Sequence, residues 1–582
     1  MNSFVKHFEA FEKLAYNFYA TILYPHTPSP RANSAEYTHS ATTALERKLI
    51  MEQMQYTANI PVSANSDVIV VGGGTAGVLA ALSAARNGAS VILLERSCAL
   101  GGNMTNGLVQ SLHGFRMHAG YENKNHTFDW STDLIIKDNL TMEVFKRLQD
   151  AGGTAFAKEH YGDPSLRENI DEEAFVYVLD AMMKEAGVKV MFDTYAFDVI
   201  KEGDKVVGVV ATNKSGAQLF TGKVIIDCSA DGDIAVKAGA DYVSGDEEGR
   251  THGICLRTAI GGIEIEKFLD YLKNRPVMTP EEAKAAKEEE WRLCNGGTQS
   301  PPTSSYEGKK KEKREFDMRG KQLTWDEQEK NMTENKFLAL SNTLTNEWVA
   351  YLKDHPYPET PYRINTSPDL LPIYPIQPML GYYGLVRGGK IRYDQMLTGT
   401  FECFVDCTNG TALSEAIAHM REINWAYLKF FRERIPGFEN AYIMKTAPLY
   451  GARESRRVVC EYCLTVDDVI KGLRPEDTIA YGGFNNVHWL TGQSGIRMFV
   501  QPIREFGIPY RSFIPKGVDN MLLAGRCYSR EFLVRSTGMP TCMVYGEAVG
   551  TAAALAIRDN VNVRDVNVSE LQKRINVSIN EV

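Results

Sequence analysis

No stretch of this sequence offers the roughly 18 consecutive apolar residues that a membrane-spanning helix needs. An excess of positive charge is also missing: the formal net charge of -9 over 582 residues opposes a general affinity for nucleic acid or anionic membranes. The 10 cysteines imply no disulfide framework in so long a chain, and no group of cysteines and histidines has metal-site spacing. Since no secretory signal is visible either, we expect a cytoplasmic protein.

Residues 1–65 are expected to form a helical extension followed by a linker. Apolar residues recur at helical spacing from Phe4 to Ile22, while charges such as Lys6 and Glu12 exclude a signal peptide. The polar face of this helix carries both signs of charge, whereas a membrane-surface helix is usually basic there. We therefore expect it to pack against the rest of the chain or against a second subunit of a homo-oligomer.

The segment 67–95 predicts a complete β-α-β unit. Its first part, 67–71, is a β-branched run of the kind found in strands buried on both faces. The alanine-rich stretch 78–87 is expected to be a helix that Gly88 closes, and 91–94 a second buried strand.

Three glycines between the first strand and the helix have the G-x-G-x-x-G spacing of a dinucleotide site. Gly72 permits the tight turn, Gly74 lets the backbone approach a pyrophosphate, and Gly77 allows close helix–strand packing. The helix N-terminus would face the phosphate charge, and Glu95 ends the second strand, where a carboxylate can bind the adenosine ribose hydroxyls. The residues expected to bind the dinucleotide here are Gly72, Gly74, Thr75, Ala76, Gly77 and Glu95.

The segment 96–107 resembles the second glycine pair of FAD-dependent oxidoreductases of the glutathione-reductase type. In that group this pair lets the chain pass close to the diphosphate and the ribityl chain, so the resemblance implies FAD rather than NAD. It also implies a cofactor-binding role for Arg96, Gly101, Gly102, Asn103 and Thr105. Sequence does not decide whether the FAD is covalently attached.

Two later segments carry the same resemblance. Residues 224–233 look like the second FAD motif of the group, an acid followed by Ala-Thr-Gly, although Cys228, Ser229 and Ala230 stand in those three positions here. Residues 508–550 look very like the C-terminus of the broad bacterial FAD-dependent oxidoreductase family, in which a strand ending in Ala-Gly-Arg passes the ribityl chain. In that family the following helix points its N-terminus at the flavin. The implied cofactor-binding residues are Ala230, Asp231, Gly525, Arg526, Met539, Pro540 and Thr541.

The resemblance implies an α/β fold with a Rossmann-like FAD-binding domain of the glutathione-reductase type. We expect this domain to be discontinuous, with its first part at 66–245 and its C-terminal part at 506–582. Residues 246–505 lack a β-α-β rhythm and are expected to form an inserted α+β substrate or cap domain.

Candidate catalytic residues come from the expected inserted domain and from the second glycine pair. His488 is the first candidate for a proton carrier and His113 the second, because histidine titrates near neutral pH; a structural role is the alternative for a lone histidine. His113 is also a candidate for covalent flavin attachment. Arg387 is a further candidate for substrate binding.

The segment 451–463 is expected to be helical and contains a Gly-x-Arg-Glu-x-Arg-Arg motif. Arg453 either clamps a substrate carboxylate or belongs to an internal ion-pair network, and for Arg457 the network is favoured. Cys460 and Cys463 have C-x-x-C spacing, which we interpret as two buried cysteines on one face of this helix.

The sequence favours a FAD-dependent dehydrogenase or ene-reductase acting on a small polar organic molecule, with or without a carboxylate. No second G-x-G-x-x-G follows a strand, so electrons would pass to or from a separate protein, oxygen or a quinone. The alternatives are a FAD enzyme without net redox, such as a hydratase or isomerase, and a tRNA-modifying-like flavoprotein. The net charge disfavours the tRNA-modifying-like flavoprotein. A flavin monooxygenase is a further alternative, but it would usually need an NAD(P)H contact, and the sequence shows no motif for one.

Overall fold

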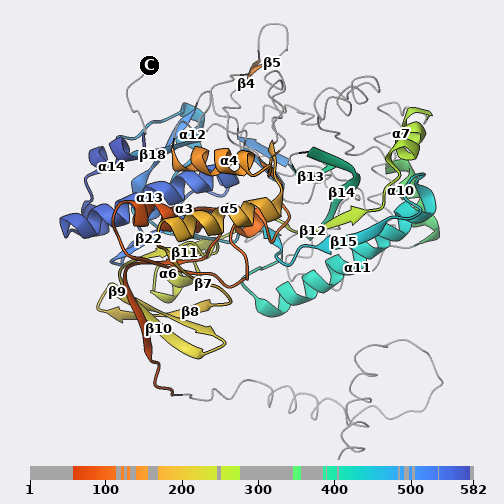
Figure 1. Ribbon diagram of the computed structural model, residues 1–582. Helices are drawn as coiled ribbons and strands as arrows, with labels where there is room; N and C mark the ends of the chain where they lie inside the picture. Colours follow the sequence, from red (N-terminus) through yellow and green to blue (C-terminus); the bar gives the residue numbers. More distant parts are fainter. Residues whose placement is uncertain are drawn as a thin grey trace, which may run out of the picture. The chain divides into compact units, whose positions relative to one another are not determined.

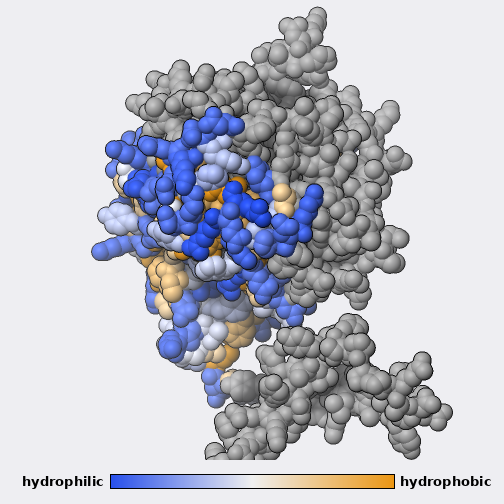
Figure 2. Space-filling view, turned by 90° about the vertical axis from the view of Figure 1, so that its right-hand side faces the viewer, coloured by the Kyte–Doolittle hydropathy of each residue, from blue (hydrophilic) through white to orange (hydrophobic). Residues whose placement is uncertain are grey.

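The computed structural model describes residues 57–112, 120–122, 128–130, 139–154, 168–245, 251–274, 345–355, 384–388, 390–402, 405–482, 486–489, 497–500, 505–534 and 536–576. Ile60–Val582 forms one compact unit, and the expected N-terminal helix lies outside the described residues. None of the helices within these ranges is long and apolar enough to cross a membrane. The described part of the face in Figure 2 is mainly hydrophilic, with small apolar areas between charged side chains.

A parallel sheet of five strands forms the centre of this unit. Its spatial order is β7 (Lys189–Met191), β2 (Val91–Leu94), β1 (Val62–Val71), β10 (Gly216–Asp227) and β22 (Met521–Leu523). The chain therefore builds outward from β1 in one direction and then continues on the other side at β10. Ligands of open α/β sheets bind at the carboxyl ends of the strands where the order reverses, which here is the β1/β10 boundary.

The N-terminal part of β10 pairs with β9 (Lys205–Asn213), and β9 pairs with β8 (Tyr195–Glu202), so that the three strands form an antiparallel meander. The turn signal 213–216, between the apolar runs 206–211 and 218–227, predicts this β9–β10 hairpin from sequence, and the structure confirms it. The Ser215 N–H holds the turn by donating to Asn213 Oδ1 at 2.9 Å. The third strand, β8, has an exposed outer edge and was not predicted.

Four helices pack together against one face of the parallel sheet (Figure 1). They are α3 (Thr75–Arg86), α4 (Leu140–Asp150), α5 (Glu172–Glu185) and α13 (Met539–Asp559). The backbones of α3 and α13 approach closely at Gly546, where a Cβ atom would collide with the carbonyl oxygen of Ala76. Glycine at this position therefore permits the close packing.

Alternate residues of β1 enter two different cores, so both faces of the sheet are buried. Val68 and Val70 pack with the four helices, whereas Ile69 and Val71 pack with the opposite face, where α6 (Asp233–Lys237) lies. This double burial explains why a continuous β-branched run, rather than an alternating one, marks the strand.

A second, antiparallel sheet lies in the region expected to be an inserted domain. Its order is β13 (Gly384–Arg387), β14 (Lys390–Glu402), β12 (Ile254–Gly261) and β15 (Tyr442–Thr446), and β16 (Gly451–Ala452) also pairs with β12. The long helix α11 (Gly410–Arg434) packs its apolar side chains against this sheet. The domain boundaries themselves stay a prediction.

Shorter elements complete the described chain. The two-stranded pairs are β3 (Ser111–Leu112) with β6 (Glu168–Asn169), β4 (Gly120–Glu122) with β5 (Phe128–Trp130), β11 (Tyr242–Ser244) with β17 (Arg456–Val458), β18 (Thr478–Gly482) with β21 (Phe506–Pro509), and β19 (Asn486–Trp489) with β20 (Arg497–Val500). The other helices are α7 (Ile265–Asn274), α10 (Thr345–Asp354), α12 (Val466–Lys471), α14 (Val568–Arg574) and the 3-10 helices η1 (Gly102–Met104), η2 (Tyr510–Phe513) and η3 (Val563–Asp565).

The helix expected over 451–463 is wrong. The chain instead forms β16, then β17, which pairs with the distant strand β11. Cys460 is buried in an isolated bridge to Pro515, and Cys463 is exposed. The Val458-Val459 pair favours strand, and the long-range partner strands that decide the matter are not visible in the local sequence.

Glu547 is a buried carboxyl group on α13. Its Oε1 accepts a hydrogen bond of 3.2 Å from the Leu140 N–H at the start of α4, and its Oε2 has no hydrogen-bond partner among the described residues. Burial raises the pKa of Glu547 to about 7, although the backbone N–H groups of Leu140 and Thr141 oppose the rise. Folding therefore favours the protonated form of this side chain.

We predict that Glu547→Gln stabilises the protein at pH 8 and has a much smaller effect at pH 5. The unfolded chain ionises Glu547 near its ordinary pKa of 4.5, so the stability that the protonated form provides is lost as the pH rises from there through about 7. The free energy of unfolding of the variant minus that of wild type, measured by urea unfolding, should be about 2 kcal/mol larger at pH 8 than at pH 5. An equal effect at both pH values would contradict the assignment.

Candidate functional site

The first glycine turn lies directly against the end of β10, at the point where the strand order reverses. Gly72 has φ +98°, and a Cβ atom there would collide with the carbonyl oxygen of Cys228. The Cys228 N–H donates to the Val71 carbonyl at 2.8 Å and so ties the ends of β1 and β10 together. Gly72 therefore meets both a conformational and a steric requirement for glycine.

Gly74 differs, because nothing in the described protein requires glycine there. Its φ of -70° suits any residue, and no atom lies within 4 Å of the position that its Cβ would take. It is the N-cap of α3, which has no side-chain cap and no acid in its first turn. Open space beside an uncapped helix N-terminus fits a pyrophosphate bound close to the backbone.

The carboxylate of Glu95 is buried beside this turn. Its Oε2 accepts a hydrogen bond of 2.6 Å from the Gly73 N–H, and its Oε1 accepts the N–H and hydroxyl of Ser97 at 2.7 and 2.6 Å. A carboxylate has about four acceptor positions, so these three donors leave capacity for a ribose hydroxyl. Glu95 thus links the end of β2 to the glycine turn, and its ribose contact stays a prediction.

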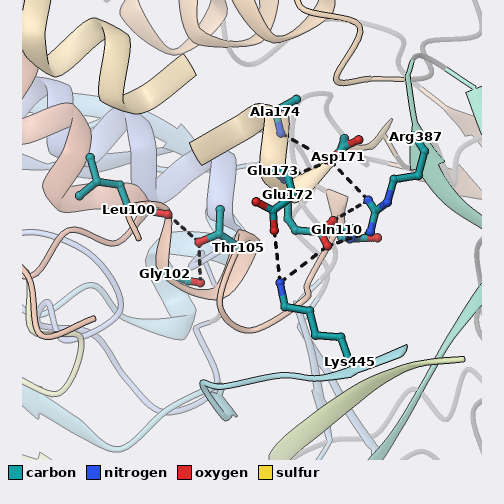
Figure 3. Close-up of polar contacts among 10 residues, drawn as sticks. All are labelled: Leu100, Gly102, Thr105, Gln110, Asp171, Glu172, Glu173, Ala174, Arg387 and Lys445. Atoms are coloured by element: carbon teal, nitrogen blue, oxygen red, sulfur yellow. Dashed lines mark hydrogen bonds and ion pairs between the residues drawn. The ribbon is translucent and has the colours of Figure 1, made fainter. Parts of the chain in front are cut away.

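The second glycine turn packs onto the first. The Gly101 N–H donates to the Gly73 carbonyl at 2.9 Å, and a Cβ on Gly102 would lie 3.0 Å from the Gly74 Cα. The Thr105 hydroxyl donates to the Leu100 carbonyl at 2.6 Å and so closes this turn (Figure 3).

Asn103 and Arg96 lie at the same edge of the sheet. The Oδ1 of Asn103 is buried without a hydrogen-bond partner among the described residues, which fits a ligand that supplies a donor. The Arg96 side chain is exposed, and its charge acts on Asp233. Burial, followed by the charges of Asp231 and Asp227, raises the pKa of Asp233 to about 6.

The second FAD motif turns sharply after β10. Asp227 is fully buried and accepts hydrogen bonds from the N–H groups of Ser229, Ile234 and Ala235 at 2.8 to 3.0 Å, which fixes the start of α6. Ala230 has φ +78°, a left-handed conformation that suits glycine. The related motif has glycine at this position, so alanine here carries backbone strain.

Asp231 forms an ion pair with Arg526 across the ends of β10 and β22. The Arg526 Nη2 lies 2.5 Å from Asp231 Oδ1, and the Ser455 hydroxyl donates to the same oxygen. The Nε of Arg526 is buried without a hydrogen-bond partner in the described chain. An unused donor beside an ion pair fits a ligand with acceptor oxygens, as a ribityl chain or diphosphate has.

Two further titratable groups lie near this ion pair. Burial above all, and then the charge of Asp231, raises the pKa of both Cys407 and Tyr450 to about 12. Both groups therefore stay protonated at neutral pH, which excludes Cys407 as a thiolate nucleophile. The sequence offered no motif for Cys407 or Tyr450, and Ser455 stands at an unspecified position of the 451–457 motif, because these residues approach the site only through tertiary packing.

The start of α13 completes this edge. The N-cap is Gly538, no side chain caps the helix, and its first turn contains no acid. Pro540 lacks an N–H and the Cys542 N–H donates to the Gly538 carbonyl at 2.8 Å, so Met539 and Thr541 supply the N–H groups without a helical partner. Such a helix start stabilises negative charge in a ligand.

The arginine motif of 451–457 lies beside the ion pair of Asp231 and Arg526. Glu454 is buried, forms an ion pair with Arg457, and lies 3.4 Å from both Arg530 Nη1 and His252 Nε2. Arg457 thus belongs to an internal ion-pair network. Arg453 lies half-buried in the turn between β16 and β17.

Arg387 lies in an ion-pair cluster at the start of α5, which Figure 3 draws together with the second glycine turn. Its Nη1 and Nη2 bind the two carboxylate oxygens of Glu172 at 2.7 and 2.9 Å. Lys445 Nζ lies 3.5 Å from Glu173, and Gln110 donates to Glu172. These contacts join β13 and β15 of the second sheet to α5, one of the helices that cover the parallel sheet.

The structure does not describe the side chain of either expected histidine. His488 lies in β19, opposite Met498 of β20, and the position of its side chain is outside the described residues. His113 lies outside them entirely.

Comparison with known proteins gives the same cofactor as the glycine turns and their surroundings indicate. A sequence profile of FAD-dependent oxidoreductases matches residues 67–575. The chain belongs to this family. Its cofactor is FAD, and it is an oxidoreductase, as the sequence predicted.

Several solved structures resemble this FAD-dependent oxidoreductase over most of its length. A geranylgeranyl bacteriochlorophyll reductase-like protein from Thermoplasma acidophilum covers 88% of this chain and 82% of its own, with 14% identity and a TM-score of 0.38. The p-nitrophenol 4-monooxygenase of Pseudomonas putida covers 88% and 84%, with 11% identity and a TM-score of 0.35. A myxobacterial chondrochloren halogenase covers 88% and 78%, with 13% identity and a TM-score of 0.36. Likeness at this level says nothing about the substrate.

No curated protein sequence matches the chain.

We predict that Ala230→Gly raises the free energy of unfolding by roughly 1 kcal/mol, because relief of left-handed strain outweighs the greater entropy of unfolded glycine. The matched control is Ala81→Gly in the interior of α3, which should lower it by about 1 kcal/mol or more. Urea unfolding of the two variants and of wild type measures both changes in the free energy of unfolding. A loss of stability in Ala230→Gly as large as that of the control would contradict the strain.

Proposed function

We propose that this enzyme transfers a hydride between FAD and a small polar organic substrate, with a carboxylate as the substrate group that its arginines suit best. The supporting observation is the convergence of five cofactor-type features at one edge of the parallel sheet. They are the uncapped start of α3 at Gly74, the second glycine turn, Glu95, the Asp231–Arg526 pair and the uncapped start of α13.

Each feature has a distinct role in this proposal. The start of α3 holds the pyrophosphate, Glu95 binds the adenosine ribose, and the Asp231–Arg526 pair binds the ribityl chain. The N–H groups of Met539 and Thr541 would stabilise the negative charge that appears on a bound flavin when it is reduced. Bound flavin supplies the chemistry of accepting or donating a hydride.

The substrate side of the proposal rests on the second sheet and its connections. Arg453 lies half-buried next to Glu454 and Ser455, and Ser455 contacts Asp231 of the cofactor edge. An arginine at that place can bind a carboxylate with two parallel hydrogen bonds. His488, on β19, is the proposed proton carrier for an alcohol or amine substrate.

The test is an anaerobic screen of small metabolites against the purified holoprotein, followed through bleaching of the flavin absorbance. We expect a carboxylate-bearing metabolite to bleach the flavin, and Arg453→Ala to raise its apparent Kd at least tenfold. The control is Arg434→Ala, whose exposed side chain forms an ion pair of 3.3 Å with Asp354 between the C-terminal ends of α11 and α10 and takes part in none of the proposed contacts.

Two outcomes would contradict the proposal. Chemically reducible FAD that no metabolite bleaches, together with turnover of a substrate without net redox, would instead support a hydratase or isomerase. Salt-dependent retention of RNA by the holoprotein would support a nucleic-acid-binding flavoprotein.

A further inference from the structure

The connection between β22 and α13 is held at one buried serine. Ser536 lies two residues before Gly538, the N-cap of α13. The Tyr528 hydroxyl hydrogen-bonds to the Ser536 hydroxyl, and the Tyr545 hydroxyl donates to the Ser536 carbonyl. Both tyrosines are fully buried and Ser536 is 5% exposed, so these bonds are shielded from water.

Aromatic packing fixes the two phenol rings. Phe513 stacks on Tyr528 with ring centres 4.8 Å apart, and its centre lies 5.0 Å from that of Tyr545. Tyr528 and Tyr545 meet edge to face at 5.3 Å. Because Tyr528 follows β22 and Tyr545 belongs to α13, the cluster joins the sheet edge to the helix across the connection.

The same connection is supported by a buried arginine. Arg530 Nη1 donates to the Val534 carbonyl at 2.8 Å, and the Arg530 side chain is almost fully buried. Immediately before Arg530 in the chain, the Ser529 N–H donates to the Ser512 carbonyl at 3.0 Å. The described part of the connection is therefore held by side chains at its middle and at its end.

Burial raises the pKa of the phenols of Tyr528 and Tyr545. Both phenols therefore stay protonated at neutral pH and keep their hydroxyl hydrogens. Removal of either hydroxyl would leave the shape of the core nearly unchanged but would release Ser536 from one of the two tyrosines that hydrogen-bond to it.

We propose that Tyr528 and Tyr545 are positioning residues that fix the start of α13 through Ser536. They thereby set how the N–H groups of Met539 and Thr541 meet the flavin and how strongly reduction is favoured. This inference rests on the proposed arrangement of the cofactor. Its physical basis is that hydrogen bonds weaken steeply with misalignment, so a small shift of the helix start weakens the stabilisation of charge on the reduced flavin.

The test compares flavin midpoint potentials of holoproteins, measured by anaerobic titration against a reference dye. The variants are Tyr528→Phe, Tyr545→Phe and Ser536→Ala. The control is Tyr510→Phe, a fully buried tyrosine of the same core whose hydroxyl donates to the Val563 carbonyl at 2.7 Å, away from the start of α13. Thermal unfolding midpoints are recorded for all four.

We expect each of the three variants to bind reduced FAD about three- to tenfold less tightly relative to oxidised FAD, which lowers the potential by about 15 to 30 mV. Ser536→Ala combined with Tyr528→Phe should shift the potential no further than either alone, because both remove the same bond. Tyr510→Phe should lower thermal stability and leave the potential unchanged.

Potentials equal to wild type in all three variants, with stability losses like that of Tyr510→Phe, would show a purely structural role and overturn the inference. A shift of equal size in Tyr510→Phe would also overturn it. The titration uses a chemical reductant, so the result does not depend on whether any metabolite bleaches the flavin. Failure of the proposed hydride transfer is therefore distinguishable from failure of this inference.

Discussion

The contact between the first glycine turn and the end of β10 is the constraint on which the rest of the site depends. Gly72 can adopt φ +98° and lie against the Cys228 carbonyl only because it has no side chain. That contact brings the start of α3 to the point where the strand order reverses, and the second glycine turn then packs on Gly73 and Gly74. From there, the ends of β10 and β22 face each other closely enough for Asp231 and Arg526 to pair.

Ion pairs and hydrogen bonds also join the second sheet to the parallel sheet and its helices at two separate places. Ser455 follows β16 and donates to Asp231, while Arg387 on β13 binds Glu172 at the start of α5. These partners are more than 200 residues apart in sequence (|i−j| of 224 and 215). The second sheet is thus tied both to the ends of the parallel strands and to one of the helices that cover them.

Local sequence predicted the parts of the fold that local chemistry determines. The run 67–71, the glycine turn, the helix after it and the hairpin turn at Asn213 each carry their own signal, and all appear in the structure. The cofactor followed from motif resemblance, which the family match confirms. The strands at 451–458 and the partners Ser455, Cys407 and Tyr450 were missed, because their positions depend on pairing with chain segments far away in sequence. The same holds for the tie between Arg387 and Glu172.

Gly74 tests the central claim most directly, since its side-chain position is open space and its φ of -70° is compatible with any residue. The measurement is FAD titration of apoprotein carrying Gly74→Ala or Gly74→Val, with Gly410→Ala, also in open space, as the control. If the pyrophosphate lies against Gly74, both substitutions weaken FAD binding at least tenfold and Val more than Ala, while the thermal unfolding of the apoprotein stays that of wild type. FAD affinity equal to wild type in Gly74→Val would contradict the account.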